Sequence, residues 1–501
     1  MNYRVYPVTT TEDFCCDYRV FIDGKEVELN TARVSAYPFN RRWPGHQRQE
    51  EQTETVQFLS FAMSAPVHIK VIPDKPTDTV TIRPSSYGLI PLINEDGSFE
   101  FDLECPRKIT VEPYGISHAL HIFADEEKDY GVDFDNPDVL YYGKGVHNIG
   151  FLQLKDNQTL FLDEGAVVYG TVHAVGVNNI RILGRGILDN RYNKEKILFD
   201  FNAIGNDMDV HNAERVYPLE IDLCRNVEID GITIRDPLVY NINFCCCENV
   251  TVNNVKLIGD WRFNSDGIHF ANCLNGSLTD SFLRTYDDSV CVRGLTDEEK
   301  ERLLENKGFI DVCRNILIEN NVIWNDWGIC FRIGAATLCE EITDVTFRNN
   351  DIIHISSPAL DCINCDYADV YDFVYENINI ELDNQILEPI IQQDDNEKYY
   401  SLNLKKDYCP YIIYMELIVH PEYSNPRFNA EKRCGKLHNF VFRNIHINGN
   451  HKIRIKFKGY DAEHLCSDIM IKDLYLNGKK LSNEELQMDC NTFCKNINYS
   501  F

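Results

Sequence analysis

The stretch "ENVTVNNVKLIGD" at residues 248–260 decides the fold of this chain. After an opening Glu-Asn pair, apolar and polar residues alternate in short β-branched segments, a pattern typical of strands. The same template recurs along the chain, and several neighbouring copies start 23–29 residues apart. Further copies start at Asn178, Arg225, Leu274, Arg314, Thr343, Tyr371, His438 and Ser467.

A repeat of this period indicates a solenoid. Parallel strands need a long crossover, and a coil of short strands and turns supplies that crossover by winding. Asn residues that recur at turn positions can stack between coils, each side-chain amide bonding the next. We therefore expect an all-β protein in which residues 141–501 form a right-handed parallel β-helix.

Residues 1–140 have a different pattern. They hold alternating segments such as "VTIRP" (80–84) and "SFEFDLE" (98–104), many Pro and few Asn-led repeats. This pattern predicts a small antiparallel β-sandwich, which we expect to cap the exposed first coil of the solenoid.

Two insertions are expected within the β-helix. Residues 295–311 contain a helix that opens with the capping box Thr296-x-x-Glu299 and closes at Gly308. Residues 384–436 form a longer insertion, and loops of that length usually build functional walls or assembly surfaces.

Composition limits the class of partner. A net charge of −29 argues against nucleic acid or an anionic membrane surface, and no run of eighteen apolar residues could span a membrane. The N-terminus lacks the features of a signal peptide. The nineteen Cys include no two CxxC motifs spaced for zinc, so we expect buried reduced thiols and a cytoplasmic protein. Formation of a homo-oligomer is left open.

Three Asp residues lie one coil apart. Asp266 belongs to "NSDG", and the pair Asp287–Asp288 begins twenty-one residues later. One coil raises the chain by about 4.8 Å, so matching registers would place the three carboxylates side by side. Successive strand residues point to opposite faces, so both members of the pair can face solvent only if one lies in a turn or bulge.

Close carboxylates raise one another's pKa values, and a protonated Asp beside an ionised one is what glycoside cleavage requires. In inverting enzymes the acid and the base stand about 6.5–9.5 Å apart to admit a water molecule. The plainer alternative is structural, because Asp and Asn tolerate the geometry of solenoid turns.

These motifs resemble the polygalacturonase-type β-helix glycosidases, glycoside hydrolase families 28 and 49. "NSDG" (264–267) and "DDSVCVRG" (287–294) resemble family 28 motifs, while residues 118–190 look more like the dextranase-type family 49, whose members carry a β-sandwich before the helix. The resemblance implies an inverting hydrolase without metal or cofactor. Asp287 would be the general acid, and Asp266 and Asp288 would hold water as the general base.

Two departures from family 28 bear on the substrate. Trp327 stands where the family has the His of a Gly-His-Gly motif, and the only "RIK" string, at 454–456, comes too late. We therefore expect cleavage of an α-linked oligosaccharide or polysaccharide, of either the dextran or isomalto type or the pectic galacturonide type.

Several residues near the motifs are candidates to contact the sugar. Trp residues can stack on a sugar face, and Arg residues can bind a hydroxyl or carboxylate or keep an Asp ionised. Core packing, structural ion pairs and the Asn ladder are the structural alternatives for these residues. The predicted substrate-binding residues are Asn264, Arg293, Trp327, Arg332, Trp261, Asn243 and His269.

Two other functions fit the same fold. In a pectate-type polysaccharide lyase the clustered Asp residues would bind Ca²⁺, and Arg293 would abstract a proton. In a non-catalytic carbohydrate-binding β-helix, Asp287→Asn would leave affinity intact.

Overall fold

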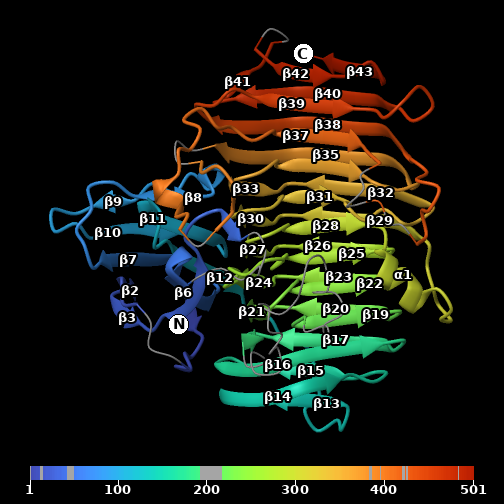
Figure 1. Cartoon of the computed structure of the whole chain (residues 1–501). Helices are drawn as coiled ribbons and strands as arrows, with labels where there is room; N and C mark the ends of the chain where they lie inside the picture. The colour runs from blue at the N-terminus through green and yellow to red at the C-terminus, as the bar shows by residue number, and fades with distance from the viewer. Residues whose placement is uncertain are drawn as a thin grey trace.

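The computed structural model describes residues 2–11, 15–41, 50–191, 217–382, 386–394, 396–419, 424, 427–482 and 485–500. A small two-sheet domain is followed by a long stack of parallel strands, and the small domain lies beside the middle of the stack (Figure 1). The predicted all-β architecture, a parallel β-helix preceded by a sandwich, is confirmed. The β-helix begins with strand β13 (Val139–Tyr142), next to the domain boundary expected between residues 140 and 141.

The N-terminal domain is a sandwich of two sheets whose inner faces share one apolar core. Its strand pairs are antiparallel except β6–β12, which is parallel. One sheet contains β1 (Tyr3–Val5), β4 (Asn30–Ser35), β6 (Thr53–Met63), β8 (Thr81–Arg83), β11 (Lys108–Ile116) and β12 (Leu120–Glu126). The other contains β2 (Tyr18–Ile22), β3 (Lys25–Val27), β7 (Val67–Pro73), β9 (Leu92–Ile93) and β10 (Phe99–Leu103).

The β-helix has three walls of parallel strands around an apolar core of aliphatic, aromatic and Cys side chains. The first wall contains β13, β15 (Thr159–Leu162), β17 (Asn178–Gly184), β20 (Arg225–Asp230), β23 (Glu248–Asn253), β26 (Leu274–Thr279), β29 (Val312–Glu319), β32 (Glu341–Arg348), β35 (Asp369–Leu382), β38 (Lys436–Gly449), β40 (Cys466–Leu476) and β43 (Cys494–Ser500). The second contains β14 (Gly145–Gln153), β16 (Ala166–Val175), β18 (Ile187–Asp189), β21 (Thr233–Arg235), β24 (Lys256–Ile258), β27 (Phe282–Thr285), β30 (Val322–Asn325) and β33 (Asp351–His354). The third contains β19 (Leu219–Asp222), β22 (Ile242–Cys245), β25 (Ile268–Ala271), β28 (Val290–Arg293), β31 (Phe331–Ile333), β34 (Leu360–Asn364), β37 (Ile413–Leu417), β39 (Arg454–Lys458) and β42 (Gln487–Cys490), and the short β41 (Lys479–Lys480) pairs antiparallel with β40.

The predicted Asn ladder is present at the turn into the first wall. Each Asn has a positive φ, a conformation that Asn tolerates better than most residues. Each side-chain amide donates to the Asn one coil before it, over 2.8–3.1 Å. The ladder runs through Asn157, Asn179, Asn226, Asn249, Asn275 and Asn315.

The sandwich lies along the side of the β-helix instead of capping its first coil. Phe58 and Phe123, on the outer face of its first sheet, pack against the second wall at residues such as Phe282 and Trp324. The rings of Phe123 and Phe282 lie 4.9 Å apart. The difference from the expected cap has a physical reason: the second wall carries outward-facing apolar residues, and these must be covered.

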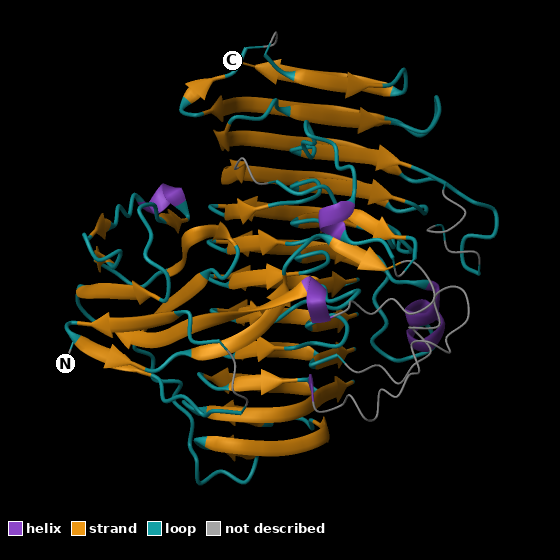
Figure 2. Cartoon of the chain, turned by 60° about the vertical axis from the view of Figure 1, so that its left-hand side comes forward, coloured by secondary structure: helices purple, strands orange, loops and turns teal. Residues whose placement is uncertain are grey.

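The insertion at 295–311 contains α1 (Asp297–Leu303), with the predicted capping box between Thr296 and Glu299. The helix ends before the expected Gly308. Part of the 384–436 insertion lies outside the described residues; in the rest, β36 (Ile390–Gln392) pairs with β5 (Phe39–Arg41), and β37 returns to the third wall. Short 3₁₀ turns are η1 (Glu50–Gln52), η2 (Ser85–Tyr87) and η5 (Tyr399–Ser401), and Figure 2 shows how little helix the chain has.

All nineteen cysteines are free, and most are buried, as expected for reduced thiols. Among the described residues, no helix has the length and apolar character needed to cross a bilayer.

Candidate active site

The three predicted carboxylates lie in two bends on neighbouring coils. Asp266 lies in the bend between β24 and β25, and Asp287 and Asp288 lie in the bend between β27 and β28. One oxygen of each carboxylate lies within 4.8 Å of an oxygen of the other two. Winding of the coils therefore brings the three carboxylates together. Asp287 and Asp288 lie in a turn, as expected if both side chains are to face solvent.

Two buried Asn side chains hold these bends. Asn241 Nδ2 donates to the Asp260 carboxylate at 2.7 Å and to the Asp266 carbonyl at 2.8 Å. Asn325 Nδ2 donates to the Asp287 carbonyl at 2.7 Å. No feature of the sequence singled out either residue, because Asn is common in every coil.

Burial and mutual repulsion raise the pKa values of all three carboxyl groups. Burial, followed by the charges of Asp287 and Asp288, raises the pKa of Asp266 well above its usual range. Burial and the charge of Asp288 raise the pKa of Asp287 to about 7. Burial also raises the pKa of Asp288, and Arg332 opposes that rise. The group therefore retains protons near neutral pH and titrates as a coupled set.

Asp288 is the carboxylate with the most support for a negative charge. Its Oδ1 accepts the backbone N–H of Ile329 at 2.8 Å, and its Oδ2 lies 3.3 Å from Arg332 Nε. Arg332 also faces Asp361, at 3.9 Å. The predicted Arg332 thus lies at the site, where it stabilises an ionised Asp.

Asp266 lies deeper, and its two oxygens have different surroundings. Its Oδ2 lies 3.0 Å from His269 Nε2. Its Oδ1 is buried and has no hydrogen-bond partner among the described residues. A buried polar atom of this kind usually binds water or a ligand. Oδ1 is therefore a candidate to bind water in the site.

Four residues predicted to contact substrate lie behind the site instead, and one of them, His269, is 3% exposed and bonded to Asp266. Arg293 is 3% exposed and bonds His269, Asn243 and Glu299. Asn243 is fully buried, and its amide faces Cys245 and Glu299.

Trp261 is 6% exposed and donates from Nε1 to Asp236, with Arg262 stacked on its ring at 4.1 Å. Spacing placed these residues near the Asp cluster correctly but could not show that their side chains are enclosed by α1 and by neighbouring turns.

Trp327 and Asn264 remain at the rim of the site. Both are half-buried, and the Trp327 ring stacks on Tyr286 with 5.9 Å between centroids. Gly328 follows directly, and a Cβ at this position would lie 2.6 Å from the Asp287 backbone carbon. The backbone of the next coil therefore lies directly against the Asp pair, and only Gly fits at position 328.

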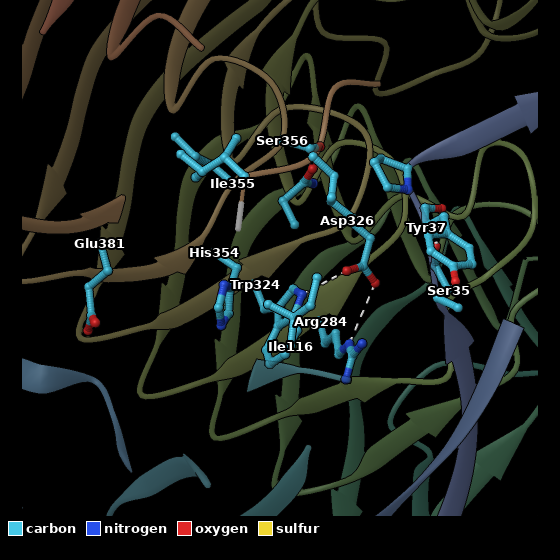
Figure 3. Close-up of a pocket in the computed structure, with 15 residues that line it drawn as sticks. Ser35, Tyr37, Ile116, Arg284, Trp324, Asp326, His354, Ile355, Ser356 and Glu381 are labelled. Carbon is cyan, nitrogen blue, oxygen red and sulfur yellow. Dashed lines mark hydrogen bonds and ion pairs between the residues drawn. The ribbon is translucent and has the colours of Figure 1, made fainter. Parts of the chain in front are cut away.

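A small cavity of about 40 Å³ lies between this coil and the N-terminal domain (Figure 3). Arg284 and Trp324 point toward Asp326 across it, and Trp324 Nε1 donates to Asp326 at 2.7 Å. The volume suffices for about two or three ordered waters. Neither member of the Asp pair lines this cavity, and it is too small for a sugar.

Within the part of the chain that the structure describes, two groups of side chains have the composition of a metal site: the three Asp residues, and Asp266 with His269 and Cys291. The second group fits a metal poorly. Arg293 donates to His269 Nδ1, so the neutral ring carries its proton on Nε2, the atom that would have to bind the ion.

Comparisons with known proteins agree with this arrangement. The model of Glycosyl hydrolases family 28 matches residues 163–412, about half of the chain and the part that holds all three carboxylates. An exo-poly-alpha-D-galacturonosidase from Dickeya chrysanthemi is 24% identical over 341 residues, covering 47% of this chain and 56% of that protein. A polygalacturonase from Brassica napus is 23% identical, covering 51% and 54%. The chain thus spans little more than half the length of these curated relatives.

The whole fold also has a solved counterpart. Dex49A from Penicillium minioluteum aligns with a TM-score of 0.58 and 13% identity, over 95% of this chain and 94% of that one. That likeness covers the sandwich as well as the helix. Through residues 163–412, this chain belongs to the polygalacturonase-like glycosyl hydrolases of family 28.

Proposed function

We propose that the protein is an inverting glycoside hydrolase that cleaves an α-linked oligosaccharide or polysaccharide. The observation that carries the proposal is the cluster of three carboxylates within 4.8 Å, one of them beside a guanidinium. Family membership supports the same reaction class. Cleavage needs a proton donor and an ionised base at one place, and this cluster supplies both.

Asp287 is the general acid in this proposal. Its pKa of about 7 keeps much of it protonated below neutral pH, so it can protonate the glycosidic oxygen. Asp288 is the general base, because Arg332 and the Ile329 N–H favour its ionised form. Asp266 holds the attacking water through its free Oδ1, while its Oδ2 is held by His269.

The short spacing raises a stereochemical question. Carboxyl groups about 5–5.5 Å apart are typical of retaining enzymes, and inverting enzymes usually have a wider gap. In a retaining reaction one carboxylate must attack the sugar directly. Asp266 is 6% exposed, and Asp288 is held at both oxygens, so both are better placed to bind water than to attack. Inversion is therefore the outcome we expect.

The substrate we favour is a pectic galacturonide. The relatives named above are a galacturonosidase and a polygalacturonase, and Arg332 offers a cation that could face a uronate carboxylate. Isomalto-oligosaccharides are the second candidate. The net charge of −29 disfavours an anionic substrate, and the RIK string of family 28 is absent at the expected coil.

The test is a reducing-sugar assay on oligogalacturonides and isomalto-oligosaccharides, with Asp287→Asn beside the wild type. Loss of a general acid lowers kcat by about 10²–10⁴-fold. Asp280→Asn is the matched control, because Asp280 occupies an exposed turn with a positive φ on the same coil. No release of reducing ends from either series would refute the proposal, and NMR of the first-formed anomer tests inversion.

A lyase of the pectate type is less favoured. It needs an exposed base, and Arg293, the residue considered for that role, is buried and paired with Glu299. Ultraviolet absorbance of the product and loss of activity with a chelator would identify a lyase.

A further inference from the structure

A chain of hydrogen bonds connects helix α1 in the 295–311 insertion with Asp266. Glu299 of α1 accepts two N–H groups of Arg293, over 2.7 and 2.8 Å. Arg293 Nε lies 2.8 Å from His269 Nδ1, and His269 Nε2 lies 3.0 Å from Asp266 Oδ2. All four side chains are buried, so water does not compete for these bonds.

The direction of each bond follows from the chemistry of Arg293. A guanidinium has only donors and does not lose its proton in proteins. His269 Nδ1 must therefore accept, which places the proton of the neutral ring on Nε2. That N–H then points at Asp266 Oδ2. Arg293, at the end of β28 and held by Glu299 of α1, thus determines which ring nitrogen carries the proton beside the carboxylate cluster.

The surroundings also keep the ring neutral and in place. Burial and the neighbouring Arg293 charge lower the pKa of His269 well below its ordinary value. The Tyr240 ring stacks on the imidazole with 4.0 Å between centroids, and Tyr217 stacks on Tyr240 at 5.3 Å. Arg293 is itself fixed, because Nη2 also donates to Asn243 and Nη1 to the Gly294 carbonyl.

We propose that Glu299 and Arg293 are positioning residues for the carboxylate cluster, acting through the tautomer of His269. Neither residue touches substrate. They hold the His269 N–H on Asp266 Oδ2, which leaves Oδ1 directed at the water in the site. The inference rests on the proposed function of the cluster, and it gives the α1 insertion a role in the reaction beyond packing.

The first experiment reads the tautomer directly. Long-range ¹H–¹⁵N NMR of the full-length protein, with His269→Gln for assignment, should show protonated Nε2, bare Nδ1 and no titration between about pH 5 and 8, because the ordinary pKa of about 6.5 is depressed here. A protonated Nδ1, or a ring that titrates near pH 6.5, would overturn the proposal. This readout does not depend on activity.

The second experiment removes the ion pair without leaving a lone buried charge. In the double variant Arg293→Gln with Glu299→Gln, the two amides can bond each other, and Gln still fits the N3 position of the capping box. The Gln at 293 can donate or accept, so His269 is free to change tautomer. We expect kcat to fall by about 10–100-fold, KM to change little, and the NMR spectrum to show protonated Nδ1, while burial still keeps the pKa of His269 below its ordinary value.

The matched control is Arg302→Gln. Arg302 also anchors α1 to the third wall, through Asp222, but does not contact His269. It should leave the tautomer and the pH profile unchanged. Glu299→Gln alone is the milder variant if the double variant does not fold. Arg293 still donates to His269 Nδ1 there, so the proton should stay on Nε2, while kcat should fall because the guanidinium loses its fixed position on α1. An altered tautomer with wild-type kcat would overturn the positioning role, whereas an inactive wild type would overturn the proposed function alone.

Discussion

Replacing Arg332 with Gln should move the pH profile of hydrolysis upward. Arg332 Nε lies 3.3 Å from Asp288 Oδ2, and this neighbouring cation favours the ionised forms of all three carboxyl groups. Removing the cation removes one of the factors that lower their pKa values. Each pKa must therefore rise, and none can fall for this reason.

The expected size follows from the geometry. At 3.3 Å and an effective dielectric constant of about 20, two unit charges attract by about 5 kcal/mol. Desolvation of the guanidinium and its second partner Asp361 reduce the net effect, and a close opposite charge usually shifts a carboxyl pKa by about 1–3 units. We expect the acidic limb, set by Asp288, to rise by that amount, and the alkaline limb, set by Asp287, to rise from about 7 by less.

The assay is the pH dependence of kcat/KM, which reports ionisations of the free enzyme. Arg332→Lys keeps the charge and serves as the control; its limbs should move by less than about one unit. Limbs that stay in place in Arg332→Gln, or that move to lower pH, would refute the assigned electrostatics.

Three further predictions concern geometry and stability. Gly328→Ala places a Cβ 2.6 Å from the Asp287 backbone, so it should cost about 1–3 kcal/mol of stability and lower kcat about 100-fold; wild-type kinetics would contradict the close approach. Asn249→Ala loses two ladder bonds and strains a φ of 58°, so urea unfolding should show a loss of about 1–3 kcal/mol, and Asn249→Gly, which relieves the φ, should lose less. Phe123→Ala opens the contact between the sandwich and the β-helix and should cost about 3–5 kcal/mol. Ile90 is 86% exposed, so Ile90→Ala should change stability by less than about 0.5 kcal/mol in the same melt.

The β-helix could be read from the sequence because its determinants are local and repeat. Asn249 and its counterparts mark each turn, and the length of the repeat sets which residues lie one coil apart. The proximity of Asp266 to Asp287 and Asp288 could therefore be predicted from their spacing in the sequence. The repeat does not show which segment packs on the outer face of a wall. The lateral position of the sandwich depends on packing between distant segments, such as Phe123 on Phe282.

The same limit applies to the candidate site. Arg293 has the right spacing to face a sugar, but Glu299, in an insertion outside the repeat, draws its guanidinium inward. Outward-facing apolar residues on the second wall, among them Phe282 and Trp324, were the available signal for the docked sandwich. Nothing in the sequence marked Asn325 as the residue that holds the Asp287 carbonyl.

The sandwich lying along the second wall changes how the molecule can come apart. A bare solenoid is held only by contacts between adjacent turns and can fray stepwise from either end. Here the sandwich shares one apolar cluster with turns as far apart as those of Val167 and Ile353, so it links the turns between them. The bends that bear the carboxylates lie within this stretch. Stepwise unfolding from the ends should therefore stop before it reaches the bends that bear the carboxylates, and amide protons there should exchange more slowly than those in the last turns near the C-terminus.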